Sequence, residues 1–70
     1  MKEIQSSMAG TVFKVLVAPG DSVDTGQTVL ILESMKMEIP VDVQMDGTVG
    51  EVKVVEGDFV NEGDTLVVLS

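Results

Sequence analysis

One lysine stands in surroundings that neither a surface turn nor a hydrophobic core explains. Lys36 lies between Met35 and Met37, within the segment ESMKME that runs from Glu33 to Glu38. A solvent-exposed turn does not need two methionines, and a core rarely accepts a charged amine. We therefore take Lys36 as the first candidate for a functional residue.

The competing interpretation of Lys36 is a solubilising side chain at a hairpin tip. Two-residue hairpins favour Asn-Gly or Gly-X because the turn needs positive φ angles. A Met-Lys tip would be strained, and strain at a tip indicates function. Met35 and Met37 would also leave adaptable apolar surface in solvent, which suits partner contact. For Met37, packing back onto the sheet edge is an equal alternative.

The composition removes several kinds of chemistry. The chain has no cysteine and no histidine, so it has no disulfide, no thiol redox chemistry and no zinc site of the usual kind. The commonest general base near neutral pH is also missing. Nothing in the spacing marks a catalytic pair among the twelve acidic residues, and no helix follows the glycines to form a phosphate loop. We expect a protein that is not an enzyme.

The charge of the chain narrows its partners. Four lysines against twelve acids give a net charge of −8, which repels nucleic acids and anionic membranes. The sequence has no secretory signal and no apolar run long enough to span a membrane. We expect a cytoplasmic protein with no nucleic-acid or membrane partner.

An internal repeat organises the chain. Residues 10–32 align with residues 47–69 at an offset of 37 without a gap, and eleven of the 23 aligned positions are identical. The identical positions include the Gly-Asp pairs at 20–21 and 57–58 and the glycines at 26 and 63. We expect these glycines and aspartates to form turns. Repeats of this kind define the fold before any other signal.

Each repeat has the same order of predicted elements. A β-branched strand at 11–17 leads through the first turn to a short extended piece around Val23 and a last strand at 29–32. The second copy places an extended piece around Val60 and a last strand at 66–69. No segment has a sustained helical period, so the sequence predicts an all-β fold.

Two copies of one β unit predict two sheets related by an approximate two-fold axis, as a small sandwich or flattened barrel. We expect a single domain over residues 1–70, with halves at about 4–32 and 41–69 and a hairpin at 33–40. Lys36 should then project from one end of the molecule, and the chain termini should gather at the opposite end.

The segment ESMKMEIPV resembles the attachment motif of biotinyl domains, in which a lysine between two methionines receives biotin. The resemblance extends over both repeats, from about Met8 to Leu69. It is closest to small stand-alone biotin/lipoyl attachment proteins or to the carrier domain of a biotin-dependent carboxylase. Ser34 stands where many biotinyl domains have alanine, and the gapless repeat leaves no room for the "thumb" insertion of some bacterial carriers. The related lipoyl domains typically have Asp-Lys-Ala at this place.

The resemblance implies a flattened barrel of two four-stranded antiparallel sheets, with Lys36 on an exposed hairpin. It implies that a biotin protein ligase joins biotin to Lys36, with Met35, Met37, Glu33 and Ser34 as recognition residues. The biotin arm would carry a carboxyl group from a biotin carboxylase to a carboxyltransferase or decarboxylase. A monomeric domain is expected.

Two other functions stay open at this point. A lipoyl carrier, or an acceptor of both cofactors, would serve a 2-oxo acid dehydrogenase-type system, although the Met-Lys-Met flanks favour biotin. An unmodified β-sandwich would act only as a binding module, and Lys36 would then be dispensable.

Overall fold

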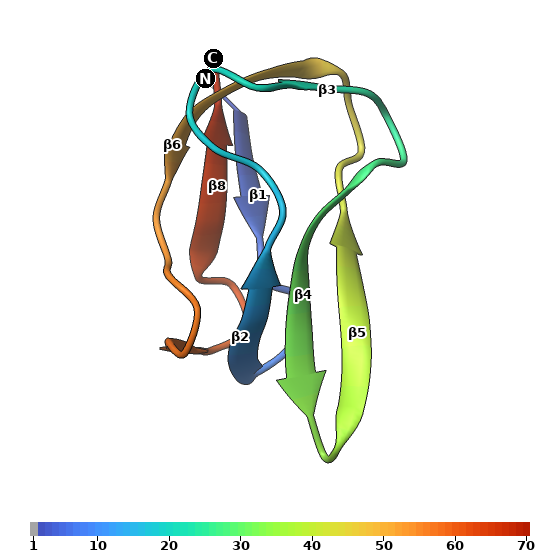
Figure 1. Ribbon diagram of the computed structural model, residues 1–70, viewed down its shortest axis with the longest axis vertical. Helices are drawn as coiled ribbons and strands as arrows, with labels where there is room; N and C mark the ends of the chain where they lie inside the picture. Colours follow the sequence, from blue (N-terminus) through green and yellow to red (C-terminus); the bar gives the residue numbers. More distant parts are fainter. Residues whose placement is uncertain (1) are drawn as a thin grey trace.

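Eight strands and no helix make up the fold in the computed structural model, which describes residues 2–70 (Figure 1). Within that range no helix is present that could cross a membrane. The strands are β1 Lys2–Gln5, β2 Gly10–Val15, β3 Ser22–Val23, β4 Thr28–Ser34, β5 Met37–Asp42, β6 Gly47–Val52, β7 Phe59–Val60 and β8 Thr65–Leu69.

The strands form two four-stranded sheets in which all neighbours are antiparallel. One sheet has the order β1-β8-β6-β3 and the other has the order β5-β4-β2-β7. Replacing each strand by its counterpart 37 residues away converts one order into the other. The predicted all-β architecture and its approximate two-fold symmetry are confirmed.

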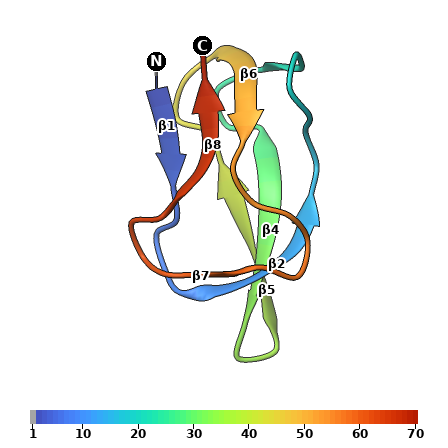
Figure 2. The ribbon, with the colours of Figure 1, turned by 90° about the vertical axis from the view of Figure 1, so that its left-hand side faces the viewer.

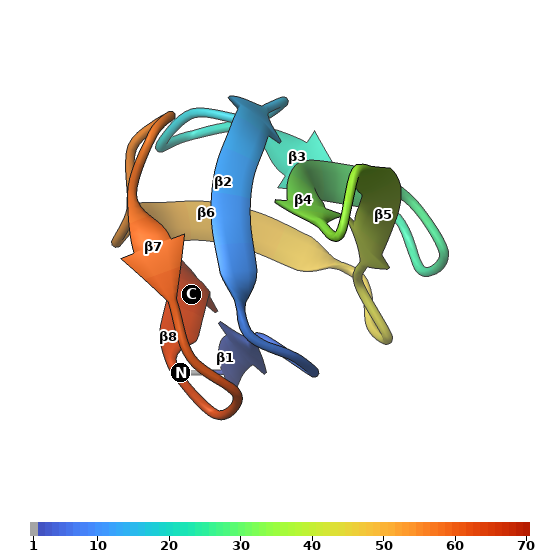
Figure 3. The same cartoon turned by 90° about the horizontal axis from the view of Figure 1, so that it is seen from below.

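The two halves of the chain interlock, which the repeat alone did not predict. Each sheet takes two strands from the first half and two from the second, so neither half forms a sheet by itself. In Figure 3, β7 of the second half lies beside β2 of the first half, with β4 on the other side of β2.

Backbone hydrogen bonds at the predicted glycine turns join the halves. The N–H of Gly20 donates to the carbonyl of Val49, and the N–H of Gly57 donates to the carbonyl of Val12, each at 2.8 Å. Gly20 and Gly57 have φ angles of 95° and 98°, which L-residues with side chains rarely adopt. A Cβ atom at either position would meet nothing within 4 Å, so the backbone angle alone accounts for glycine.

The aspartate that follows each of these glycines closes the same turn. The carboxylate of Asp21 accepts the N–H of Ala18 at 2.9 Å, and that of Asp58 accepts the N–H of Val55 at 3.0 Å. The prediction that these aspartates serve as turn residues is confirmed.

The core between the sheets consists of valine and leucine side chains with Ile4, and neither phenylalanine belongs to it. Leu30, Leu32, Leu66 and Leu69 are its largest fully buried side chains. They come from β4 and β8, each of which lies second in the order of its sheet with a paired strand on both sides.

One predicted strand is shorter than expected. β2 ends at Val15 rather than at residue 17, because its pairing with β4 stops at Val15 opposite Leu30. Only the N–H of Leu16, which donates to the carbonyl of Val29, continues the contact. A β-bulge at Phe13 also shifts the register within this strand pair.

A side-chain contact outside the repeat pattern joins the turn between β3 and β4 to the connection between β5 and β6. The N–H and the hydroxyl of Thr25 both donate to the same carboxylate oxygen of Asp46, at 2.7 and 2.8 Å. These hydrogen bonds lower the pKa of Asp46 below its ordinary value because they favour the charged carboxylate. The hydrogen bond from the backbone N–H has the larger effect.

The lowered pKa predicts a pH dependence of stability for Asp46. Its contribution is fully present above the ordinary aspartate pKa of about 4 and is lost as the pH falls through the lowered value. The variant Asp46→Asn should therefore unfold at a lower temperature than the wild type at pH 7, and the difference should shrink towards pH 2. Thermal unfolding followed by circular dichroism measures both. A difference that stays constant over this pH range would show that the charge of Asp46 has no part in it.

Candidate functional site

The segment that carries Lys36 is a tight hairpin between β4 and β5. The two strands pair from Thr28 opposite Asp42 to Ser34 opposite Met37, so only Met35 and Lys36 form the turn. Their φ angles are 52° and 65°. Two successive positive φ angles define the type I′ turn that right-handed strand twist favours in two-residue hairpins.

The turn is strained because it contains no glycine or asparagine. Within residues 2–70, Met35 and Lys36 are the two non-glycine residues with positive φ. The left-handed conformation costs a residue with a Cβ atom about 1–2 kcal/mol. The β4–β5 ladder imposes this conformation on the turn, and the expectation that a Met-Lys tip would be strained is confirmed.

The hairpin tip lies at one end of the long axis of the molecule, which measures 31 Å, and both chain termini lie at the other end (Figure 1). Figure 2 shows the β4–β5 loop extending below the other strands. The predicted placement of Lys36 opposite the termini is confirmed.

The side chains at the tip are open to solvent. Met35 is 91% exposed and Met37 is 63% exposed, so Met37 does not pack back onto the sheet edge. Lys36 is exposed as well. In the part of the chain that the structure describes, the one ion pair joins Lys53 and Glu51, so no carboxylate holds the Lys36 ammonium group.

Two acidic residues stand below the tip. Glu33 and Glu38 are exposed and lie directly opposite each other in the β4–β5 ladder. Like charges in this position repel, so the pair is tolerated at a cost in stability. Ser34 is half-buried and closes the ladder opposite Met37. The hairpin therefore brings together all the residues that the sequence singled out around Lys36.

Gly10 supports the base of the hairpin, and sequence reasoning recognised it only as a repeat position. A Cβ atom on Gly10 would lie 3.0 Å from the carbonyl oxygen of Glu33 and 3.6 Å from the Cβ of Ser34. A side chain there would press on the backbone just before the turn. The signal available in the sequence was a glycine at a strand start, which is typical of close backbone approach.

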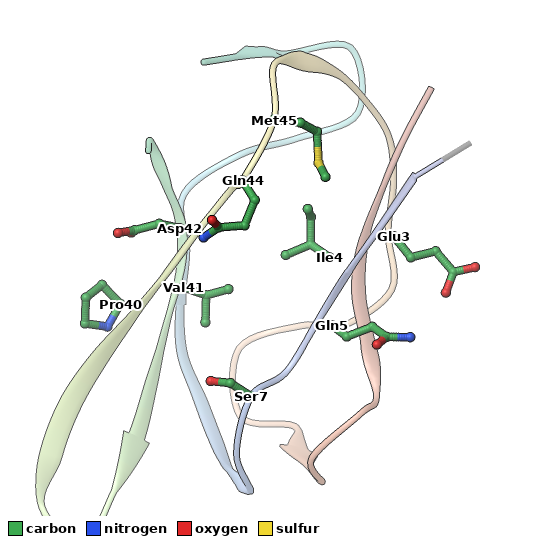
Figure 4. Close-up of a pocket in the computed structure, with 9 residues that line it drawn as sticks. All are labelled: Glu3, Ile4, Gln5, Ser7, Pro40, Val41, Asp42, Gln44 and Met45. Atoms are coloured by element: carbon green, nitrogen blue, oxygen red, sulfur yellow. The ribbon is translucent and has the colours of Figure 1, made fainter. Parts of the chain in front are cut away.

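A hollow of about 410 Å³ lies between the edge strands β1 and β5, away from the lysine (Figure 4). Its acidic side chains, Glu3 and Asp42, each accept a hydrogen bond from a threonine hydroxyl, of Thr65 at 2.8 Å and of Thr28 at 2.6 Å. Both carboxylates thus bridge neighbouring strands. Among the residues described there is no cluster of acids that could hold a metal ion.

The chemistry that this hairpin offers is that of a single accessible amine. Lys36 is presented on a two-residue turn, by a ladder that fixes its backbone, with two exposed methionines beside it. This arrangement suits a residue that other enzymes must reach and recognise.

Comparisons with known proteins agree on one family. A family model described as "Biotin-requiring enzyme" matches residues 2–69. The chain is 64% identical over 36 residues to the methylmalonyl-CoA carboxyltransferase 1.3S subunit of Propionibacterium freudenreichii subsp. shermanii. This alignment covers 51% of this chain and 29% of that protein. It is also 57% identical over 38 residues to the biotin/lipoyl attachment protein of Bacillus subtilis (strain 168). That alignment covers 54% of this chain and 52% of the attachment protein.

The fold is shared with a much larger enzyme. The urea carboxylase of Kluyveromyces lactis superposes on the chain with a TM-score of 0.92 at 33% identity, over 99% of this chain and 6% of that one. The chain spans about half or less of the length of the carboxyltransferase subunit and of the attachment protein.

The strain in the turn predicts that Lys36→Gly stabilises the domain. Glycine adopts positive φ without steric cost, so we expect the free energy of unfolding to rise by about 1 kcal/mol. Urea unfolding of wild type and variant measures the change. Lys36→Ala, which keeps a Cβ atom in the turn, should leave stability near the wild-type value. If Lys36→Gly unfolds at the same or lower urea concentration, the turn stores no strain.

The close approach at Gly10 predicts that Gly10→Ala displaces the hairpin base. The added methyl group meets a backbone oxygen, and we expect a loss of about 1–3 kcal/mol in the free energy of unfolding. Gly50→Ala is the matched control, since its Cβ atom would meet its nearest neighbours at 3.4 Å. The two variants should separate clearly in urea unfolding, and equal stability would mean that the hairpin base has room for a side chain.

Proposed function

Because the chain belongs to the family of biotin/lipoyl attachment domains, we propose that residues 1–70 form one biotin carboxyl carrier domain and that biotin is attached to Lys36. The domain itself is a non-catalytic carrier. Its amine receives the cofactor, and other enzymes carry out the chemistry.

The observation that carries the assignment to Lys36 is its place in the fold. Lys2 and Lys14 lie within strands β1 and β2, and Lys53 is paired with Glu51 at 3.2 Å. Lys36 alone among the four lysines occupies a turn of two residues with positive φ. A ligase that recognises the type I′ tip with its flanking Met35 and Met37 would therefore reach one lysine and not the others.

The part that this chain plays in attachment is simple. An ordinary lysine amine is protonated at neutral pH, and a proton must leave its nitrogen before that nitrogen can attack an activated carboxyl group. A second proton leaves Nζ as the amide bond forms and the leaving group departs from the carboxyl carbon. The net charge of the chain then changes from −8 to −9.

The fold supports the role of a cofactor carrier in two ways. The β4–β5 ladder holds the turn in one shape, so each partner enzyme meets the same surface. When bound, biotin supplies the site that takes up and releases a carboxyl group. Because the arm stays tethered to Lys36, its effective concentration at successive active sites is high.

The partners follow from this role. We assign a biotin protein ligase to attachment, a biotin carboxylase to loading and a carboxyltransferase or decarboxylase to unloading. The assignment is supported by the similarity to a carboxyltransferase subunit and to a urea carboxylase. A cytoplasmic location stays a prediction.

Lipoate is the second candidate for the group on Lys36. The observation in its favour is the 57% identity to the biotin/lipoyl attachment protein of Bacillus subtilis, whose name covers both cofactors. Against it stand the methionines at 35 and 37, in place of the residues typical of lipoyl domains.

Attachment is tested by intact mass. Co-expression with a biotin protein ligase should add the mass of one biotinyl group to the wild type and none to Lys36→Arg, which keeps the charge but cannot form the amide. Lys53→Arg is the control and should be modified fully. An unmodified wild type would contradict the proposal, and modification by a lipoate ligase alone would establish the second candidate.

A further inference from the structure

Three large apolar side chains on or directly beside β2 and β7, in the sheet that carries the hairpin, are open to solvent. Phe13, Leu16 and Phe59 are 41%, 49% and 66% exposed. We call these three residues the phenylalanine patch. Phe59 of β7 lies opposite Thr11 of β2, and Phe13 lies two residues farther along β2, at the β-bulge.

The two-fold symmetry provides an internal comparison for this patch. The residues 37 positions away from Phe13, Leu16 and Phe59 are Gly50, Lys53 and Ser22. Ser22 lies opposite Thr48 in β6, as Phe59 lies opposite Thr11 in β2. The same backbone framework therefore carries small or charged residues on the second sheet, so the fold does not require apolar residues here.

The patch is continuous with the hairpin. Thr11, which faces Phe59, is paired on its other side with Glu33 of β4. Phe59 is therefore about 10 Å from Glu33, two strand spacings away, and Lys36 lies about 10 Å farther along the hairpin. An enzyme that holds the tip can contact the patch with the same surface.

Acidic groups surround the patch. Glu33, Glu56 and Asp58 lie on the segments that flank it, whereas Lys14 is the cation on β2. A partner surface that is complementary to the phenylalanine patch has an apolar recess surrounded by basic side chains. An enzyme that binds bicarbonate and ATP must present cationic groups near its active site, since both substrates are anions.

From these observations we propose that the phenylalanine patch is the docking surface for the biotin carboxylase that loads the arm. A ligase must take Lys36 Nζ itself into its active site, so it grips the tip. The carboxylase acts at the far end of the attached arm, so the body of the domain lies beside the entrance. This inference rests on the proposed function.

The test compares loading with attachment in biotinylated protein. The biotin carboxylase that serves the chain in its native cell is purified, and fixation of labelled bicarbonate with ATP is measured against carrier concentration. The test variant is Phe13→Ser/Phe59→Ser, and the control is Ser22→Ala/Thr48→Ala on the second sheet. Thermal unfolding confirms that each variant is folded. If the double variant does not fold, the single variant Phe59→Ser, at the more exposed position, replaces it.

We expect the KM for the patch variant to rise at least tenfold with kcat within twofold of the wild type, and the control variant to match the wild type. The rate of biotin attachment should be equal in all three. An unchanged KM overturns the inference, and so does an equal fall in the attachment rate, which would place the ligase on the patch. If the biotinylated wild type itself is not loaded, the proposed function fails as well, and the wild-type measurement distinguishes that result.

Discussion

The fold depends on the hydrogen bonds that cross between its two halves at the glycine turns. A chain of 70 residues without cysteine, and without a metal cluster in its described part, has no covalent or metal crosslink to hold it together. Each half instead lends strands to both sheets, and the N–H groups of Gly20 and Gly57 bond to strands of the opposite half. The halves cannot separate without breaking both sheets. The rigidity of the hairpin at the far end follows from this cooperation, because β4 lies inside one of those shared sheets.

Because the hairpin is rigid, its tip presents the same side chains in the same positions to every partner. Stability alone would favour glycine in the turn, yet the chain keeps two residues with side chains at positive φ. The strain is small compared with the packing of Leu30 and Leu32 in the strand below, both fully buried. A stable core therefore lets the tip hold a conformation that exposes a methionine, a lysine and a second methionine in a fixed order.

Much of this arrangement could be predicted from the sequence because the repeat is gapless. The offset of 37 residues placed the turn glycines, the aspartates that close the turns and the unmatched segment around Lys36. The interlocking of the halves could not be predicted, since identical residues do not tell which strand pairs with which. The β-bulge at Phe13 and the contact between Thr25 and Asp46 were also missed. The bulge recurs at Gly50, the counterpart of Phe13 in β6, although the two residues differ in type. Thr25 and Asp46 correspond to Glu62 and Ala9, so the repeat holds no information about their contact.

The neighbouring position of the chain ends has a consequence for the architecture of larger proteins. Lys2 is paired with Leu69, so the first and last strands lie side by side at the end opposite the lysine. A domain with such ends can be inserted into a loop of a host polypeptide as a cassette, because entry and exit need almost the same point on the host surface. The lysine then faces away from the host at a reach set by the 31 Å length of the domain. The urea carboxylase is an example of a long polypeptide in which a domain of this fold occupies 6% of the chain.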